Sequence, residues 1–81
     1  MANTKDNITA TIEKVIAESG EPMETKEVQE EIQKSLGVVS RGKVLYRLND
    51  LRGQGEIAGK FVGSGKGAWI WWKKGRWEQK R

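Results

Sequence analysis

The sequence has no cysteine and no histidine among its 81 residues. Without cysteine, disulfide bonds and thiolate metal sites are excluded, and without histidine the commonest general base and metal ligand is missing. We therefore expect no enzymatic activity, no cofactor and no metal ion. The longest apolar run, residues 68–72, is far too short to span a bilayer, and no signal-peptide pattern is visible. These absences predict a soluble cytoplasmic protein with no membrane partner and no small-molecule substrate.

Positive charge is concentrated in the second half of the chain. Residues 1–40 contain four Lys or Arg against eight Asp or Glu, a net charge of −4. Residues 41–81 contain eleven against three, a net charge of +8. This asymmetry favours a polyanionic partner for one face of the molecule. Charge alone leaves open the alternative of an ordinary soluble protein that happens to be basic.

Apolar residues recur at helical spacing in three segments. The pattern predicts helices over residues 5–19, 26–35 and 41–52, the second capped by Thr25 and the third by Ser40. Glycine and the single proline separate the first helix from the second. Acidic residues make the exposed side of the second helix negative, so we expect that side to face away from a polyanion.

Two segments near the end of the chain are typical of strands. Residues 56–62 and 68–73 are rich in β-branched and aromatic side chains, and the glycine-rich segment 63–67 between them favours a turn. The order of these elements predicts an α+β fold in which three helices precede a β-hairpin.

Three short helices closed by a glycine-tipped hairpin resemble the winged helix-turn-helix family. The resemblance covers nearly the whole chain and is most telling in residues 44–57, where a glycine stop after the third helix is followed by a Gly-Glu-Ile entry into the wing. It implies a third helix that enters the major groove and a C-terminal β-hairpin wing that touches the neighbouring backbone or minor groove. The length of the chain suits one domain over residues 1–81, and its charge pattern predicts an ordered part at about 5–74 followed by a basic tail at 75–81.

A narrower likeness concerns the Zα group of winged helices, which bind left-handed Z-form nucleic acid. Lys43 and Tyr46 match the basic and tyrosine positions of that group on the third helix, and Trp69 or Trp71 matches its tryptophan. Gly42 stands where the group has asparagine, and the wing lacks the proline pair. The missing asparagine removes a central phosphate contact.

Candidate DNA contacts follow from the chemistry of the two partners. Lys and Arg bind phosphates, and side chains that reach base edges read sequence. Arginine pairs well with guanine and asparagine with adenine. For Tyr46 a half-buried position against the wing remains an alternative, and for Asn49 simple solvation. The predicted contacts are Arg41, Lys43, Tyr46, Arg47, Asn49, Lys60, Lys66, Lys73 and Lys74.

Four tryptophans crowd the basic end of the chain. In a strand, Trp69 and Trp71 share one face and Trp72 lies on the other. One face should cover the core beside Ile57 and Phe61. Beyond packing, the three strand tryptophans are candidates for stacking on bases or for a protein interface.

Together these observations predict double-stranded DNA binding through a recognition helix at about residues 41–52 and a basic glycine-rich wing. Such a protein is a transcriptional regulator or a chromatin-type factor, associated with nucleoid or chromatin. The alternative is a winged helix used as a protein-interaction module, which includes a homodimer, because fold does not determine function. Binding of Z-form nucleic acid or of structured RNA is a lesser alternative.

Overall fold

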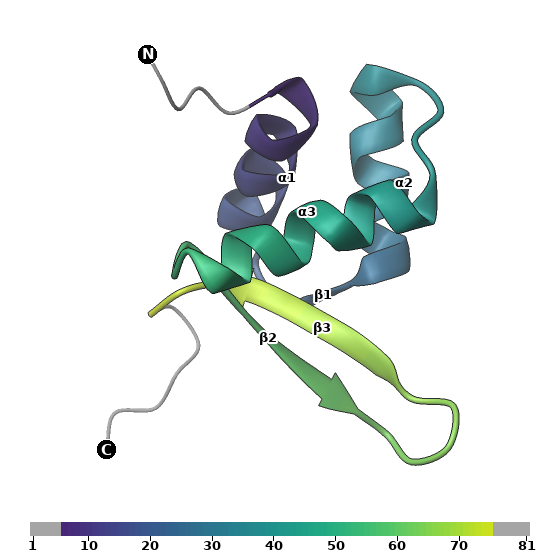
Figure 1. The fold of residues 1–81 in the computed structure, drawn as a ribbon, viewed down its shortest axis with the longest axis vertical. Coiled ribbons are helices and arrows are strands. Elements are labelled where there is room, and N and C mark those ends of the chain that lie inside the picture. Colours follow the sequence, from purple (N-terminus) through teal and green to yellow (C-terminus); the bar gives the residue numbers. More distant parts are fainter. Residues whose placement is uncertain (1–5, 76–81) are drawn as a thin grey trace.

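Three helices and a three-stranded antiparallel sheet make up residues 6–75, the part of the chain that this computed structural model describes (Figure 1). This confirms the predicted α+β fold, and the predicted residues 5 and 76–81 lie outside the described part. No helix within residues 6–75 is both long and apolar enough to cross a membrane. The elements in chain order are α1 (Asn7–Glu18), β1 (Met23–Glu24), α2 (Thr25–Leu36), α3 (Arg41–Gly53), β2 (Ile57–Val62) and β3 (Ala68–Lys73).

The first and third helices begin at side chains that satisfy their free backbone N–H groups. The carboxylate of Asp6 accepts a hydrogen bond from the Thr9 N–H at 2.8 Å, and the hydroxyl of Ser40 accepts one from the Lys43 N–H at 3.2 Å. Short polar side chains at this position stabilise a helix by about 0.5–2 kcal/mol relative to alanine. The predicted Ser40 cap is confirmed, and α3 ends one residue later than predicted, at Gly53.

The second helix begins one residue earlier than predicted. Glu24, not Thr25, is its N-cap residue, and the Glu24 N–H donates to Oε1 of Glu27 at 2.8 Å. The assignment of Thr25 as the cap was therefore wrong. Its hydroxyl instead accepts a hydrogen bond from Nε1 of Trp71 at 2.9 Å. A buried indole N–H requires such an acceptor, and this long-range contact outweighs the local capping preference.

The sheet places β3 in the middle, between β1 and β2. Phe61 of β2 lies opposite Trp69, and Met23 of β1 lies opposite Trp71. Strand β1 was not predicted, because two residues are too few to show the alternation that marks a strand. Its formation depends on β3, which lies far away in the sequence.

The hydrophobic core lies between the helices and the inner face of the sheet, with Trp71 completely buried at its centre. The ring of Trp71 lies over Gly59 on the neighbouring strand, where an added Cβ would come within 2.6 Å of ring carbons. A glycine is therefore needed at position 59. The core consists of Ile12, Ile16, Val28, Ile32, Val39, Val44, Leu48, Leu51, Ile57 and Trp71.

Phe61 departs from the prediction that it packs beside the core. Its strand neighbour Ile57 is buried, but Phe61 itself is 47% exposed. The hairpin extends beyond the helices, so its far half has less core to cover (Figure 1). Phe61 belongs instead to the projecting wing formed by β2, β3 and the turn between them.

Candidate nucleic-acid interface

The exposed face of α3 carries three predicted contacts in its N-terminal half. Arg41 and Lys43 are both exposed. Tyr46 is 70% exposed, which rules out the alternative of a half-buried ring against the wing. The opposite side of α3 is completely buried, so this helix presents one polar face. The buried stripe consists of Val44, Leu48 and Leu51.

Asn49 and Arg52 occupy the C-terminal half of the same helix. The side-chain amide of Asn49 donates to the Leu45 carbonyl oxygen at 3.1 Å, and Nη2 of Arg52 lies 3.5 Å from Oδ1 of Asn49. The Arg52 guanidinium also lies 5.2 Å from the centre of the Trp69 ring. Because the Asn49 amide is hydrogen-bonded within its own helix, the side chains of α3 that are more available to a partner lie near Arg41.

Arg47 lies on the side of α3 that faces α1 and is held there. Its guanidinium forms an ion pair with Asp6, and Nη1 lies 3.5 Å from the Thr9 hydroxyl. Its side chain is 24% exposed. Hydrogen bonds from the Thr9 backbone and side chain, together with the Arg47 guanidinium, lower the pKa of the Asp6 carboxyl. The charge of Arg47 is thus offset by Asp6, whereas Arg41 and Lys43 have no ion-pair partner within residues 6–75.

A groove of about 280 Å³ separates α3 from the wing. Lys26 at the start of α2 and Arg41 at the start of α3 both line it, together with apolar side chains of α3 and the wing. In Figure 1, α3 crosses above the sheet and the hairpin projects below it, away from the helices. The lining residues are Glu24, Thr25, Lys26, Arg41, Leu45, Phe61, Gly67, Ala68 and Trp69.

Sequence reasoning missed three residues of this region: Lys26, Arg52 and Phe61. Lys26 carried a usable signal, because it occupies the first turn of the helix that precedes a recognition helix. Arg52 was visible as a cation on the flank of the third helix. The exposure of Phe61 could not be predicted, because the strand pattern of residues 56–62 is equally compatible with a buried position for Phe61.

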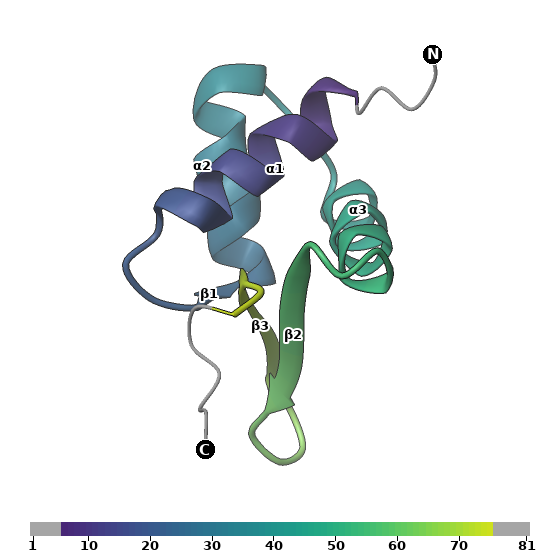
Figure 2. The same ribbon diagram turned by 90° about the vertical axis from the view of Figure 1, so that its left-hand side faces the viewer.

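The basic residues of the hairpin do not share one face. Lys66 lies exposed in the turn at the tip of the wing. Lys60 of β2 pairs with Ile70 of β3. Because side chains alternate between the two faces along a strand, Lys60 and Ile70 lie on the face opposite to Trp71, away from the helices. Figure 2, which looks nearly along α3, shows β2 in front of β3, with the hairpin projecting below the helices. Lys60 therefore does not join the cations of α3.

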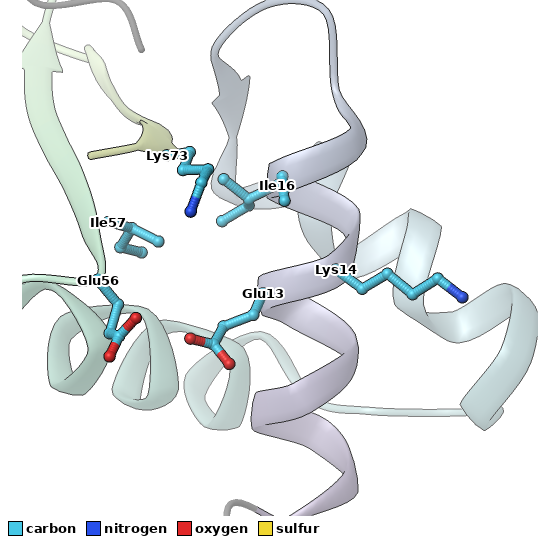
Figure 3. A pocket seen from close by; sticks show the side chains of 7 residues that line it. Glu13, Lys14, Ile16, Glu56, Ile57 and Lys73 are labelled. Atoms are coloured by element: carbon cyan, nitrogen blue, oxygen red, sulfur yellow. The ribbon is translucent and has the colours of Figure 1, made fainter. Parts of the chain in front are cut away.

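Lys73 lies at the base of the sheet, away from the groove. Its ammonium group points into a pocket between α1 and the sheet, where the carboxylates of Glu13 and Glu56 also point (Figure 3). This acidic surrounding makes Lys73 a poor phosphate contact. Lys74 follows it and is exposed, also at the base of the sheet.

Of the three strand tryptophans, Trp71 does not fit the prediction of stacking or interface contacts. It is completely buried, so no base or partner reaches its ring. Trp69 is half-buried, stacked on Trp71 with ring centres 5.4 Å apart. Trp72 is half-buried on the other face of the sheet. As predicted, Trp69 and Trp71 share the face that covers the core.

The acidic side of α2 lies away from the groove, as expected. Glu27, Glu30 and Glu31 line a separate pocket with Ser19 and Pro22, near the end of α1. These three carboxylates therefore lie outside the groove between α3 and the wing.

No protein-family model matches the sequence, and no curated protein matches it. Among solved structures, a chain of HOP2 is similar, from work on the DNA recognition and protein interaction domains and the homologous DNA pairing properties of HOP2. The two superpose with a TM-score of 0.71 at 22% sequence identity, over 84% of this chain and 100% of that chain. The chain has the winged-helix fold, with α2 and α3 as the helix-turn-helix and β2–β3 as the wing.

Proposed function

We propose that the chain binds double-stranded DNA, with the N-terminal half of α3 at the base edges and the tip of the wing at the backbone. The chain would act without catalysis as a transcriptional regulator or a chromatin-type factor on nucleoid or chromatin. The similar HOP2 structure comes from a protein described as having DNA recognition and protein interaction domains. That description adds support for DNA as the partner.

One observation carries the proposal: exposed cations lie in and beside the groove between α2, α3 and the wing. Lys26 and Arg41 line this groove, and Lys43 is exposed in the first turn of α3. Lys66 is exposed farther away, in the turn at the tip of the wing. Several phosphates along one strand can contact such a set of cations. Tyr46 stands on the same exposed face of α3, where its hydroxyl can donate a hydrogen bond to a phosphate or a base.

The proposal is tested by measuring the affinity for a short labelled duplex by fluorescence anisotropy over a series of salt concentrations. Affinity should fall linearly on logarithmic axes, with a slope that diminishes by about 1 for each phosphate contact removed. Arg41→Glu and Lys43→Glu should weaken binding and flatten the slope. Binding that is absent at low salt, or indifferent to salt, would contradict the proposal.

Lys14→Glu is the matched control, because it makes the same charge change on α1. Lys14 is one of the residues at the pocket between α1 and the sheet, where its ammonium group points away from Glu13 and Glu56 (Figure 3), and it does not line the groove beside the wing. This variant should bind DNA nearly as well as the wild type. An equal loss in Lys14→Glu and Arg41→Glu would mean that only net charge matters, and would contradict a defined interface.

Competition experiments separate the nucleic-acid alternatives. An RNA duplex of matched sequence should compete poorly, because the major groove of A-form RNA is too narrow for a helix to read. An alternating GC duplex whose circular dichroism spectrum inverts on mixing would favour the Z-form reading. An unchanged spectrum with retained binding favours B-form DNA.

A protein-interaction role is the second candidate, and one residue favours it. Val38, in the turn between α2 and α3, is 96% exposed, and exposed apolar side chains can anchor partners. The homodimer version predicts concentration-dependent self-association that Val38→Ser abolishes, as measured by sedimentation. It also predicts that Arg41→Glu and Lys43→Glu leave the association unchanged.

A further inference from the structure

The groove between α3 and the wing is lined by both apolar and charged side chains. Leu45, Phe61 and Trp69 are the large apolar residues of the lining, and Lys26 and Arg41 are its cations. Within residues 6–75 neither of these two cations is held in an ion pair. A concave apolar surface with a few polar groups at its edge is the usual form of a ligand site.

Phe61 is the unusual member of this lining, because it is held in place and yet exposed. It packs edge-on against Trp69 with ring centres 6.1 Å apart. Below it lies Gly67, where an added Cβ would come within 2.9 Å of the Phe61 ring and 2.1 Å of the Val62 carbonyl oxygen. Any larger residue at position 67 would clash with the Phe61 ring, so glycine is needed for this ring position. With 47% of its surface exposed, Phe61 offers a fixed aromatic wall to the groove.

Trp69 is less available than Phe61 for an incoming ring. Trp71 stacks on it, and the Arg52 guanidinium lies 5.2 Å from its centre. It therefore supports the groove more than it offers a free face. Phe61 is the residue of this groove on which a flat apolar ligand can lie.

An intact duplex fills such a groove poorly. Its outer surface offers phosphates to Lys26 and Arg41, but its bases are stacked inside and cannot reach Phe61. An unpaired nucleotide offers both a phosphate and a flat aromatic base, the combination that single-strand sites recognise with cations and aromatic side chains. Glu24, the one carboxylate that lines the groove, is an acceptor for the amino group of a base.

We propose that this groove binds one unpaired nucleotide adjoining a duplex, with its base against Phe61 and its phosphate near Lys26 and Arg41. The inference rests on the proposed duplex binding and extends it. A protein with such a groove prefers DNA ends, gaps or junctions that carry an unpaired base over a continuous duplex.

The test compares the affinity for a blunt duplex with that for the same duplex carrying a few unpaired nucleotides. The wild type should bind the overhang duplex more tightly, by about five- to a hundredfold, which is the range that base–aromatic stacking supplies per base. Phe61→Ala should reduce this ratio to near one, so it should weaken binding to the overhang duplex more than binding to the blunt duplex. Phe61→Leu should also lose most of the preference, because it keeps apolar volume but has no aromatic face, and Phe61→Trp should retain it.

Tyr46→Ala is the matched control, because it removes an exposed aromatic ring outside the groove. It should weaken binding to both duplexes in the same proportion and leave their ratio intact. Circular dichroism melts of each variant report whether it is folded. If the wild type binds blunt and overhang duplexes equally, or if folded Phe61→Ala keeps the preference, this inference is wrong and duplex binding stands. If neither duplex binds, the proposed function itself is wrong.

Discussion

The guanidinium of Arg47 on α3 is paired with the carboxylate of Asp6, the residue that caps α1. One acidic side chain therefore does two things: it accepts the hydrogen bond of the Thr9 N–H at the start of α1, and it links α1 to α3. The pair also withdraws one cation from the surface that we propose for DNA. Both consequences can be measured.

Asp6 should make the stability of the fold depend on pH. Its pKa is lower in the folded chain than its ordinary value of 3.8, chiefly through the Thr9 hydrogen bonds. The stabilisation is therefore complete above that value and is lost as the pH falls below it. Asp6→Asn, which keeps a capping oxygen but has no charge, should be less stable than the wild type near neutral pH.

The difference in the free energy of unfolding between the wild type and Asp6→Asn should become smaller at acid pH. Urea denaturation followed by tryptophan fluorescence, at neutral pH and below pH 3.8, measures it. A difference between wild type and Asp6→Asn that is the same at both pH values would show that the carboxylate charge does not contribute.

Releasing Arg47 should also change DNA binding. In Asp6→Asn the guanidinium loses its counter-charge, so its positive charge is no longer offset within the protein. We expect tighter duplex binding and a steeper salt dependence, by up to about 1 in the logarithmic slope if the arginine gains a phosphate contact. The double variant Asp6→Asn with Arg47→Gln should cancel the gain. If the double variant still binds the duplex more tightly than the wild type, the higher affinity does not come from Arg47.

Removing the Thr25 hydroxyl should destabilise the core, because it leaves the buried Trp71 N–H without its acceptor. Thr25→Val should lower the free energy of unfolding by about 1–3 kcal/mol, the usual penalty for an unsatisfied buried polar group. Thr25→Ser keeps the acceptor and should lose much less. Thr11→Val is the matched control, since Thr11 has no hydrogen-bonding side-chain partner within residues 6–75. Similar losses in all three variants would argue against the Trp71 hydrogen bond as the cause.

Two glycines should respond in opposite directions to a methyl group. At Gly59 the added Cβ would meet the immobile ring of Trp71, so Gly59→Ala should lose about 1–3 kcal/mol through overpacking. At Gly42, on the exposed side of α3, nothing lies within 4 Å of an added Cβ. Gly42→Ala should be neutral or gain at most about 1 kcal/mol from better helix propensity. Thermal denaturation of both variants provides the comparison.

Local patterns predicted the elements better than the contacts between them. Apolar periodicity and the Ser40 cap placed all three helices to within two residues, because those signals act inside one segment. Strand β1 escaped prediction because Met23 and Glu24 become a strand only by pairing with β3. Similarly, Thr25 was taken for a cap because its bond to Trp71 joins two distant segments.

The same limit applies to the candidate site. Exposure of Arg41, Lys43 and Tyr46 followed from the helical period alone. The pairing of Arg47 with Asp6 and the acidic surroundings of Lys73 depend on how α1 packs against α3 and the sheet, which no local pattern encodes. The direction of Lys60 was within reach of the sequence, since strand alternation places it on the side away from Trp71 once the register is known.

Strand β1 is only two residues long, yet it pairs with β3, the central strand of the sheet, immediately before α2 begins. It thereby couples the base of the wing to the helix-turn-helix through the backbone itself. The spacing between α3 and the wing is then part of the fold itself. If the chain binds DNA as proposed, a duplex that does not match this spacing would have to bend or widen, and the sequence-dependent stiffness of DNA would contribute to selectivity.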